Sequence, residues 1–274
     1  MLPALRTTVE AHGLMAKKAL GQNFLLDQNI TDKIIRLSLA GQNLANYNGA
    51  NVFEIGPGPG GLTRAILSAE PERLTVIEMD ERCIAIMQDI KDKVGERLDI
   101  INGDALKQNL SVIADAPRHI VSNLPYNISV PLLISWLKDI ENFASLTLMF
   151  QKEVAERIMA KIKTKDYGRI SVLSQLLCKV EKLFDLNPEC FVPAPKIWSS
   201  VLLFTPLHSG LSEKDIANIE HLTTLAFGQR RKMIRQSLKS IPNIEQICQD
   251  LDISLTMRAE ELTPEQYLAL ARHL

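Results

Sequence analysis

Short apolar segments alternate with helical patterns over most of the chain, and this alternation limits the fold more than any other feature. Strand-like segments fall at 51–55, 74–78, 98–102, 119–123 and 145–150, and helical patterns at 61–69 and 81–93. Short strands separated by helical stretches predict a mostly parallel sheet with helices on both faces. The sequence therefore predicts an α/β fold.

The pattern changes after Gln151. A predicted helix at 152–162 is followed by two strand-like segments, 177–186 and 199–204, with no helix assigned between them. Two such strands predict an antiparallel hairpin at one edge of the sheet. Residues 206–211 read as a linker, and from Ser212 the chain is expected to be helical, with Ser212-x-x-Asp215 as a helix cap. We predict a main domain at 1–205 and a small all-helical domain at 206–274.

Charge, cysteine content and apolar run length exclude several classes of protein. The net charge is −1, with 31 Lys+Arg against 32 Asp+Glu, so only a local patch could attract a polyanion. The four cysteines form no Cys-x-x-Cys pair, which argues against a zinc ribbon or a disulfide scaffold. Apolar runs are far shorter than the ~20 residues of a membrane helix, and the N-terminus resembles no targeting peptide. We expect a cytoplasmic protein without membrane contact.

A glycine-rich loop follows the first of these strands. Gly56, Gly58 and Gly61 satisfy Gly-x-Gly-x-x-Gly, and Glu78 ends the next strand. Glycines let the backbone approach a ligand, and an acid at this position accepts hydrogen bonds from ribose hydroxyls. The pattern serves an NAD-dependent dehydrogenase and an S-adenosylmethionine-dependent enzyme alike.

Two further acids favour S-adenosylmethionine. Glu54 adds negative charge where a cationic methionine moiety would lie, and Asp104 closes the third strand, where it could accept from an adenine amino group. An aspartate in such a loop is often only a helix cap. Asp104 together with Glu78 and the loop nevertheless favours the sulfonium cofactor.

The segment Asn123-Leu124-Pro125-Tyr126 follows the fourth strand, at the carboxyl edge where open parallel sheets bind ligands. An adenine amino group is a poor nucleophile because its lone pair is delocalised into the ring. The Asn123 side-chain carbonyl and a neighbouring backbone carbonyl can accept both amino hydrogens and localise that lone pair. Pro125 fixes the turn, and Tyr126 offers a stacking surface worth ~1–3 kcal/mol per base. No dehydrogenase needs this arrangement.

These motifs resemble those of the ribosomal RNA small-subunit adenine N6-dimethyltransferase (KsgA-like) family, and matching segments span nearly the whole chain. One departure is Trp198, where the family pattern leads us to expect a small acidic residue. The matching segments, besides the glycine loop and Glu78, are Leu20-Gly-Gln-Asn-Phe24-Leu25, Gly103-Asp104-Ala-Leu106, Asn123-Leu-Pro-Tyr-Asn-Ile-Ser129, Phe191-Val-Pro-Ala-Pro195-Lys196 and Phe227-Gly-Gln-Arg-Arg231-Lys232.

The resemblance implies a Rossmann-like S-adenosylmethionine-dependent methyltransferase sheet followed by the small helical domain. It implies dimethylation of two adjacent adenosines near the 3′ end of small-subunit ribosomal RNA, in ribosome biogenesis. We expect a monomer that acts on a pre-ribosomal small subunit and needs no metal, because the sulfonium supplies the leaving group. Phe191 looks like the second face of an aromatic clamp with Tyr126. The implied site residues are Asn123, Leu124, Pro125, Tyr126 and Phe191 for catalysis, and Asn23, Leu25, Gly56, Gly58, Glu78, Asp104 and Asn123 for the cofactor.

A basic segment lies within the otherwise acidic C-terminal region. Arg230, Arg231, Lys232, Arg235 and Lys239 have no acid among them, and Arg231 and Arg235 would lie one turn apart on a helix. Charge runs are usually solvated faces, but this local excess favours contact with RNA phosphates through residues 230, 231, 232 and 235. Residues Lys17 and Lys18 are a weaker second candidate.

Two alternatives share much of this pattern. One is the related methylase that modifies large-subunit ribosomal RNA. The other is an RNA- or transcription-binding protein that keeps the fold without catalysis, although the intact Asn123–Tyr126 segment and cofactor set speak against it.

Overall fold

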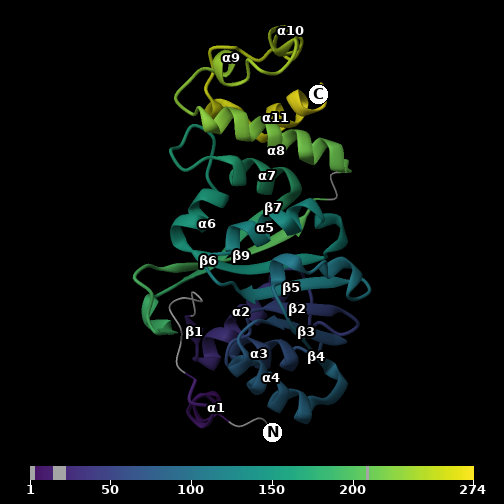
Figure 1. Ribbon diagram of the computed structural model, residues 1–274, viewed down its shortest axis with the longest axis vertical. Coiled ribbons are helices and arrows are strands. Elements are labelled where there is room, and N and C mark those ends of the chain that lie inside the picture. Colours follow the sequence, from purple (N-terminus) through teal and green to yellow (C-terminus); the bar gives the residue numbers. More distant parts are fainter. Residues whose placement is uncertain (1–3, 15–22, 208–209) are drawn as a thin grey trace. The chain divides into compact units, whose positions relative to one another are not determined.

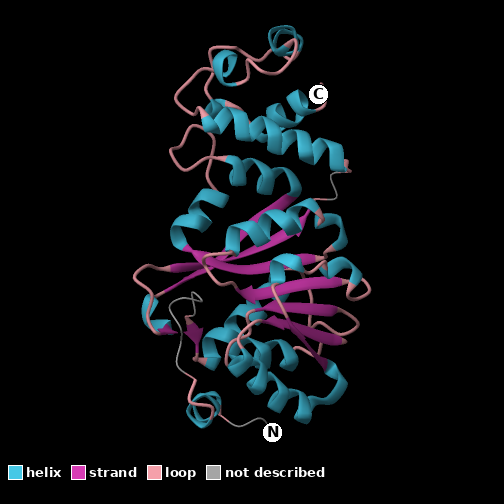
Figure 2. Cartoon of the chain, in the orientation of Figure 1, coloured by secondary structure: helices cyan, strands magenta, loops and turns pink. Residues whose placement is uncertain are grey.

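The computed structural model describes residues 4–14, 23–207 and 210–274 (Figures 1 and 2). Within these ranges, seven strands form one sheet in the order β4-β3-β2-β5-β6-β9-β7. The paired strands β2 to β6 run parallel, and β9 pairs antiparallel with β6. The predicted α/β fold with antiparallel strands at one edge is therefore confirmed. The strands are β2 (Asn51–Ile55), β3 (Arg73–Glu78), β4 (Leu98–Asn102), β5 (Arg118–Asn123), β6 (Ser145–Gln151), β7 (Cys178–Leu186) and β9 (Ser199–Pro206).

A separate two-stranded sheet joins distant parts of the chain. Strand β1 (Phe24–Leu25) pairs antiparallel with β8 (Phe191–Val192), with Leu25 opposite Phe191. This pairing fixes the segment that begins at Asn23 against the loop between β7 and β9.

Helices α2 (Gln28–Gly41), α3 (Gly61–Ser68) and α4 (Glu81–Val94) share one hydrophobic core with alternate residues of the strands, such as Leu74 and Val76. Strand side chains alternate between faces, so these helices cover one face of the sheet. Asp80 begins α4, because its carboxylate accepts the Arg82 backbone N–H at 3.1 Å. The other helical segments here are α1 (Leu5–Ala11), α5 (Ser129–Lys138) and the 3₁₀ turns Gly95–Arg97, Ala105–Lys107, Leu110–Val112, Ile140–Asn142 and Pro188–Cys190.

Strand order reverses between β2 and β5, the central neighbours of the sheet. Open parallel sheets bind ligands at the carboxyl ends of their strands, beside such a reversal. The glycine loop follows β2 and the Asn123–Tyr126 turn begins at the end of β5, so the fold places both at this point.

A second compact unit comprises residues 153–180 and 206–274. The predicted division at 205/206 assigned residues 153–180 to the main domain. In the structure this segment packs with the C-terminal helices. Tyr167 explains this, because its side chain is buried there and its hydroxyl donates to the Leu262 carbonyl at 3.0 Å. The helices of this unit are α6 (Lys152–Ile158), α7 (Arg169–Leu177), α8 (Glu213–Gly228), α9 (Ile234–Ser237), α10 (Ile244–Asp250), the 3₁₀ turn Ala259–Glu261 and α11 (Pro264–Ala271).

Helix α6 ends at Ile158, earlier than the predicted residue 162, and α7 follows where no helix was assigned. The Gln175 side-chain amide of α7 donates to the Ile158 and Ala160 carbonyls at 3.1 and 2.9 Å, which satisfies the end of α6. The predicted cap of α8 is confirmed, since Ser212 and Asp215 each accept the other's backbone N–H. Residues 208 and 209 of the expected linker lie outside the described residues. None of the helices in the described ranges is long and apolar enough to span a membrane.

Candidate active site

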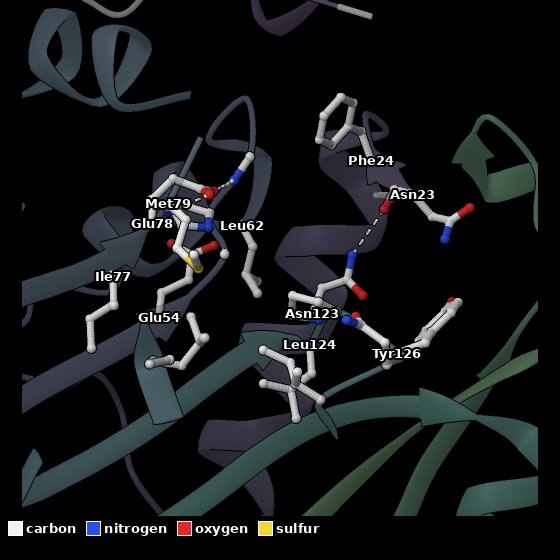
Figure 3. A pocket seen from close by; sticks show the side chains of 18 of the residues that line it. Asn23, Phe24, Glu54, Leu62, Ile77, Glu78, Met79, Asn123, Leu124 and Tyr126 are labelled. Atoms are coloured by element: carbon white, nitrogen blue, oxygen red, sulfur yellow. Dashed lines mark hydrogen bonds between the residues drawn. The ribbon is translucent and has the colours of Figure 1, made fainter. Parts of the chain in front are cut away.

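A cavity of about 330 Å³ opens at the carboxyl ends of the central strands (Figure 3). Its walls come from the segments that follow β2, β3, β4 and β5, together with the segment that enters β1. Every residue predicted to bind the cofactor lines this one cavity: Asn23, Leu25, Gly56, Gly58, Glu78, Asp104 and Asn123. The fold thus gathers residues that lie far apart in the sequence.

The glycine loop approaches the rest of the cavity too closely for side chains. Gly56 and Gly58 have φ of +65° and +54°, which favours glycine. A Cβ at Gly58 would lie 2.9 Å from the Phe24 ring, and one at Gly56 would lie 3.3 Å from Pro125. The loop is therefore in van der Waals contact with the two segments that carry Asn23 and Asn123.

Glu78 is held in place at the end of β3 by backbone donors. Its carboxylate accepts the Met79 and Asp80 N–H groups at 2.8 and 2.9 Å, and the Gly58 N–H at 3.4 Å. Burial raises the pKa of Glu78, and these hydrogen bonds oppose the shift. The carboxylate thus links β3 to the glycine loop at the wall of the cavity (Figure 3).

Asp104 serves as a cap and also lines the cavity. Its Oδ1 accepts the Leu106 N–H at 3.0 Å and so begins the 3₁₀ turn that follows β4. Its Oδ2 has no partner among the described residues and is available to a ligand donor.

The sequence analysis did not identify two exposed apolar residues of the cavity wall. Met79 and Leu106 both line the cavity, yet their side chains are 60% and 44% exposed. Each follows a cavity acid closely in sequence, which is the signal that could have found them. Exposed apolar side chains beside two acids suit a flat, partly polar ring such as adenine.

The Asn123–Tyr126 turn leaves two acceptors unused. The Asn123 Nδ2 donates to the Asn23 carbonyl at 3.2 Å, which orients the amide so that Oδ1 can face a ligand (Figure 3). The Pro125 and Tyr126 carbonyls accept from Ile128 N and Ser129 Oγ. The Leu124 carbonyl has no partner among the described residues. The turn therefore offers one side-chain and one backbone carbonyl close together.

Tyr126 lines the cavity beside Asn123 (Figure 3). Its hydroxyl lies 2.8 Å from the Ser199 Oγ, and Ser199 is fully buried at the start of β9. Burial raises the pKa of the Tyr126 phenol, so it stays neutral at physiological pH. The hydrogen bond positions the ring and leaves the hydroxyl no role as a base.

Phe191 lies elsewhere than the aromatic clamp requires. Its side chain is 2% exposed, belongs to the hydrophobic core and is not part of the cavity wall. The pairing of β8 with β1 is the cause, since it places Phe191 opposite Leu25. In this structure Phe191 supports the strand that follows Asn23, and only Tyr126 of the two rings faces the cavity.

Comparison with known proteins identifies the family. A family model described as "Ribosomal RNA adenine dimethylase" matches residues 13–274. The chain belongs to this family. The ribosomal RNA adenine dimethylases are methyltransferases that use S-adenosylmethionine, so the protein is an S-adenosylmethionine-dependent enzyme.

Similar proteins agree over the full length. The chain is 46% identical to "Ribosomal RNA small subunit methyltransferase A" of Rhodospirillum rubrum, covering 99% of this chain and 92% of that protein. It is also 46% identical to the protein of that name from Cereibacter sphaeroides, covering 100% and 97%. A solved dimethyladenosine transferase from Plasmodium falciparum aligns with a TM-score of 0.75 and 26% identity, over 89% and 94% of the two chains. The 23S rRNA methyltransferase ErmE, with a TM-score of 0.66 and 23% identity over 92% and 99%, shares the fold.

The cavity of this adenine dimethylase fits S-adenosylmethionine by its donor and acceptor groups. Glu78 and Asp104 line it with carboxylate oxygens, the type of acceptor that ribose hydroxyls and an adenine amino group require. Glu54 is a buried residue of β2 that lines the cavity. Its carboxyl group accepts a hydrogen bond from the Thr63 hydroxyl at 2.7 Å. An ionisable carboxyl at that depth suits a cationic ligand.

Glu54 should make the stability of the ligand-free protein depend on pH. Burial raises its pKa from 4.5 to about 8, the Thr63 hydrogen bond lowers it, and Glu78 raises it further. Between these values the folded state holds a proton that the unfolded state has lost, so the free energy of unfolding falls as pH rises. One proton gives a slope of at most about 1.4 kcal/mol per pH unit.

Urea unfolding of wild type and Glu54→Gln, at pH values spanning about 5 to 8, measures this effect. We expect the stability difference to move in favour of the variant as pH rises. Glu72→Gln, which changes an exposed glutamate of the same unit, serves as the control. A difference that does not vary with pH would contradict the raised pKa.

The basic segment is not a continuous helical stripe, and that prediction is wrong. Helix α8 ends at Gly228, and residues 229–232 form a turn and a bend. Of the five basic residues, only Arg235 lies on the short helix α9. Met233 forms an isolated antiparallel β-bridge with Arg258, and the Ile234 backbone N–H donates to the Met257 carbonyl at 2.7 Å. This pairing pulls the chain out of helical geometry so that Ile234 can be buried.

The basic side chains of this segment differ in their surroundings. Arg230 donates to the Thr164 carbonyl at 2.9 Å and forms an ion pair with Glu260 at 3.6 Å, so it is engaged within the helical unit. Arg231, Lys232, Arg235 and Lys239 are exposed. Residues Lys17 and Lys18 lie outside the described residues.

The same unit brings a second group of cations to this segment, which the sequence analysis missed. Lys161, Lys163 and Lys165 are exposed in the loop between α6 and α7. The hydrogen bond from Arg230 to Thr164 joins that loop to the basic segment. Only tertiary packing creates this combined basic surface, because the two segments are far apart in the chain.

Proposed function

We propose that this protein dimethylates the N6 atoms of two adjacent adenosines near the 3′ end of small-subunit ribosomal RNA. The single observation that carries the proposal is the position of the Asn123–Tyr126 turn, which shares one cavity with the glycine loop and Glu78. Family membership and relatives named for the small subunit support it. We propose that the enzyme acts as a monomer in the cytoplasm, on a pre-ribosomal small subunit.

Bound S-adenosylmethionine would supply a methyl group on a sulfonium sulfur. Because this sulfur departs as a neutral thioether, it is a good leaving group without a metal. Glu78 and Asp104 would hold its ribose and adenine, with Met79 and Leu106 beside the ring. The Gly56–Gly58 loop, Asn23 and Leu25 would border its remaining parts. Glu54 would lose its proton when a cation lies nearby, since an opposite charge favours the carboxylate.

The substrate side of the cavity uses the turn at the end of β5. Asn123 Oδ1 and the Leu124 carbonyl would accept the two N6 hydrogens, and Tyr126 would stack on the adenine. Two acceptors held by the fold draw the amino nitrogen toward tetrahedral geometry, which exposes its lone pair toward the cofactor. Pro125 keeps the turn rigid. These roles need a single adenine flipped out of the RNA into the cavity.

Deprotonation needs no dedicated base in this cavity. An amino nitrogen that has gained a methyl group and lost conjugation is strongly acidic and releases its proton readily. The neutral Tyr126 hydroxyl is already paired with Ser199, which agrees with a positional role.

Methyl transfer to isolated ribosomal subunits tests the proposal. Labelled S-adenosylmethionine is offered to unmethylated small subunits and to large subunits, and the modified nucleotides are mapped by mass spectrometry. We expect dimethyladenine at two adjacent positions in small-subunit RNA. Label in large subunits alone would favour the related methylase that modifies large-subunit ribosomal RNA, and RNA binding without label would favour the non-catalytic alternative.

Arg231 and Arg235 are expected to contact RNA phosphates. Reversing both charges, as Arg231→Glu/Arg235→Glu, should weaken RNA binding without changing cofactor affinity. The dependence of log K on log salt should become less steep by roughly 0.9 for each duplex phosphate that the variant no longer neutralises. Filter binding of small-subunit RNA at several salt concentrations measures the slope.

Lys214→Glu/Arg272→Glu is the matched control for this prediction. It changes the net charge by the same amount in the same helical unit, and Arg272 lies 3.9 Å from Asp215 near the start of α8. An equal decrease of the slope in both double variants would show that only overall charge matters.

A further inference from the structure

Trp198 is an exposed tryptophan, and none of the roles proposed above explains its exposure. Its side chain is 45% exposed, although tryptophan is the largest apolar side chain and gains most from burial. Val192 and Ile197 in the same loop are 54% and 39% exposed. Trp198 also stands where the family pattern led us to expect a small acidic residue. An exposed apolar group of this kind marks a surface that another molecule covers.

The position of Trp198 connects it to the substrate side of the cavity. It directly precedes Ser199, whose hydroxyl lies 2.8 Å from that of Tyr126. Its own carbonyl accepts the Lys152 N–H at 2.8 Å, which ties the residue to the end of β6. Ser199 is opposite Gln151 in the β6–β9 pair. Trp198 therefore lies at the same edge of the sheet as the Asn123–Tyr126 turn.

A cation accompanies the exposed ring. The Lys152 Nζ lies 5.9 Å from the Trp198 ring centre and 3.6 Å from an Asp185 carboxylate oxygen. Asp185 also accepts the Ser200 hydroxyl at 2.7 Å, so this group of side chains is anchored to β9. Lys196, two residues before the tryptophan, is exposed as well. An aromatic face beside lysines is the usual combination for one base and its phosphate.

We propose that Trp198 stacks a nucleotide adjacent to the target adenine, while Lys152 contacts the phosphate beside it. The proposal rests on the proposed function, since the occupant is a further part of the same RNA. When the target base leaves its stack, its neighbour loses a stacking partner as well. Trp198 replaces that partner and holds the strand at the entrance of the cavity. It is a positioning residue, which acts on the RNA and not on the reacting atoms.

Intrinsic fluorescence isolates Trp198, because the chain has 2 tryptophans and the other, Trp136, is 4% exposed in α5. The Trp136→Phe variant is titrated with a short oligoadenylate and with an abasic ribose-phosphate oligomer of equal length. We expect saturable quenching by the oligoadenylate only. Oligoadenylate binding, seen by anisotropy of a labelled strand, without quenching would overturn the proposal. If Trp136→Phe does not fold, the fluorescence of Trp198→Phe is subtracted from that of the wild type, which gives the same Trp198 signal.

Kinetics on unmethylated small subunits provide the second measurement. Trp198→Ala should raise KM for the subunit by about 5- to 150-fold, the equivalent of one stacked base. Turnover at saturating substrate and cofactor affinity should not change, and Trp198→Tyr should restore most of the affinity. An unchanged KM in Trp198→Ala would overturn the proposal while leaving the proposed function intact. Absence of methyl transfer by the wild type would instead overturn the proposed function.

Discussion

Asn123→Ala is expected to remove nearly all methyl-transfer activity while the protein stays folded. The Asn123 amide is oriented by its bond to the Asn23 carbonyl, and its Oδ1 is the side-chain acceptor of the turn. Losing one fixed hydrogen-bond partner at a reacting group costs about 100- to 1,000-fold in rate. Single-turnover methyl transfer to unmethylated small subunits, at saturating RNA and cofactor, measures this loss directly.

Cofactor affinity needs a separate measurement, because Asn123 lines the cavity in which we propose that both ligands bind. Calorimetric titration with S-adenosylmethionine should show a modest loss, far smaller than the loss in rate. Asn102→Ala is the matched control, since Asn102 is an exposed asparagine at the end of β4 and is not part of the cavity wall. If Asn123→Ala kept a rate within about tenfold of Asn102→Ala, Asn123 would not be the acceptor that activates the amino group.

Tyr126→Ala is expected to lose far more activity than Tyr126→Phe. The alanine variant loses the stacking face, worth ~1–3 kcal/mol, which corresponds to about 5- to 150-fold in kcat/KM. The phenylalanine variant keeps the ring and loses only the bond to Ser199. Partial variants should accumulate monomethyladenine, because the monomethylated nitrogen has one fewer hydrogen to anchor it. Chromatography of the digested RNA resolves both products.

Ser199→Ala distinguishes the effect of the Tyr126 ring from that of its hydroxyl group. In Tyr126→Phe, the buried Ser199 hydroxyl loses its partner, which carries its own cost. The double variant Tyr126→Phe/Ser199→Ala removes both groups and should be at least as active as Tyr126→Phe. A Tyr126→Phe variant as inactive as Tyr126→Ala, not relieved by Ser199→Ala, would assign the hydroxyl a chemical role.

The sequence alone determined the sheet and most of the cavity. The parallel strands of the sheet are short apolar runs, so β2 to β6 were predicted to within one residue at each end. Glycine spacing and strand-end acids are local signals, and the order of strands brings them together. For this reason Gly56, Glu78, Asp104 and Asn123 were all found to line one cavity.

Tertiary structure decided what depends on contacts between distant segments. Phe191 is covered because β8 pairs with β1, and a short loop sequence does not reveal its partner strand. The basic segment leaves helical geometry because Met233 and Ile234 pair with residues 257–258, a long-range contact that overrides a good helical pattern. The lysines of the loop between α6 and α7 join Arg230 through packing around Tyr167. Local periodicity reports which face of an element is buried, and only the fold reports what buries it.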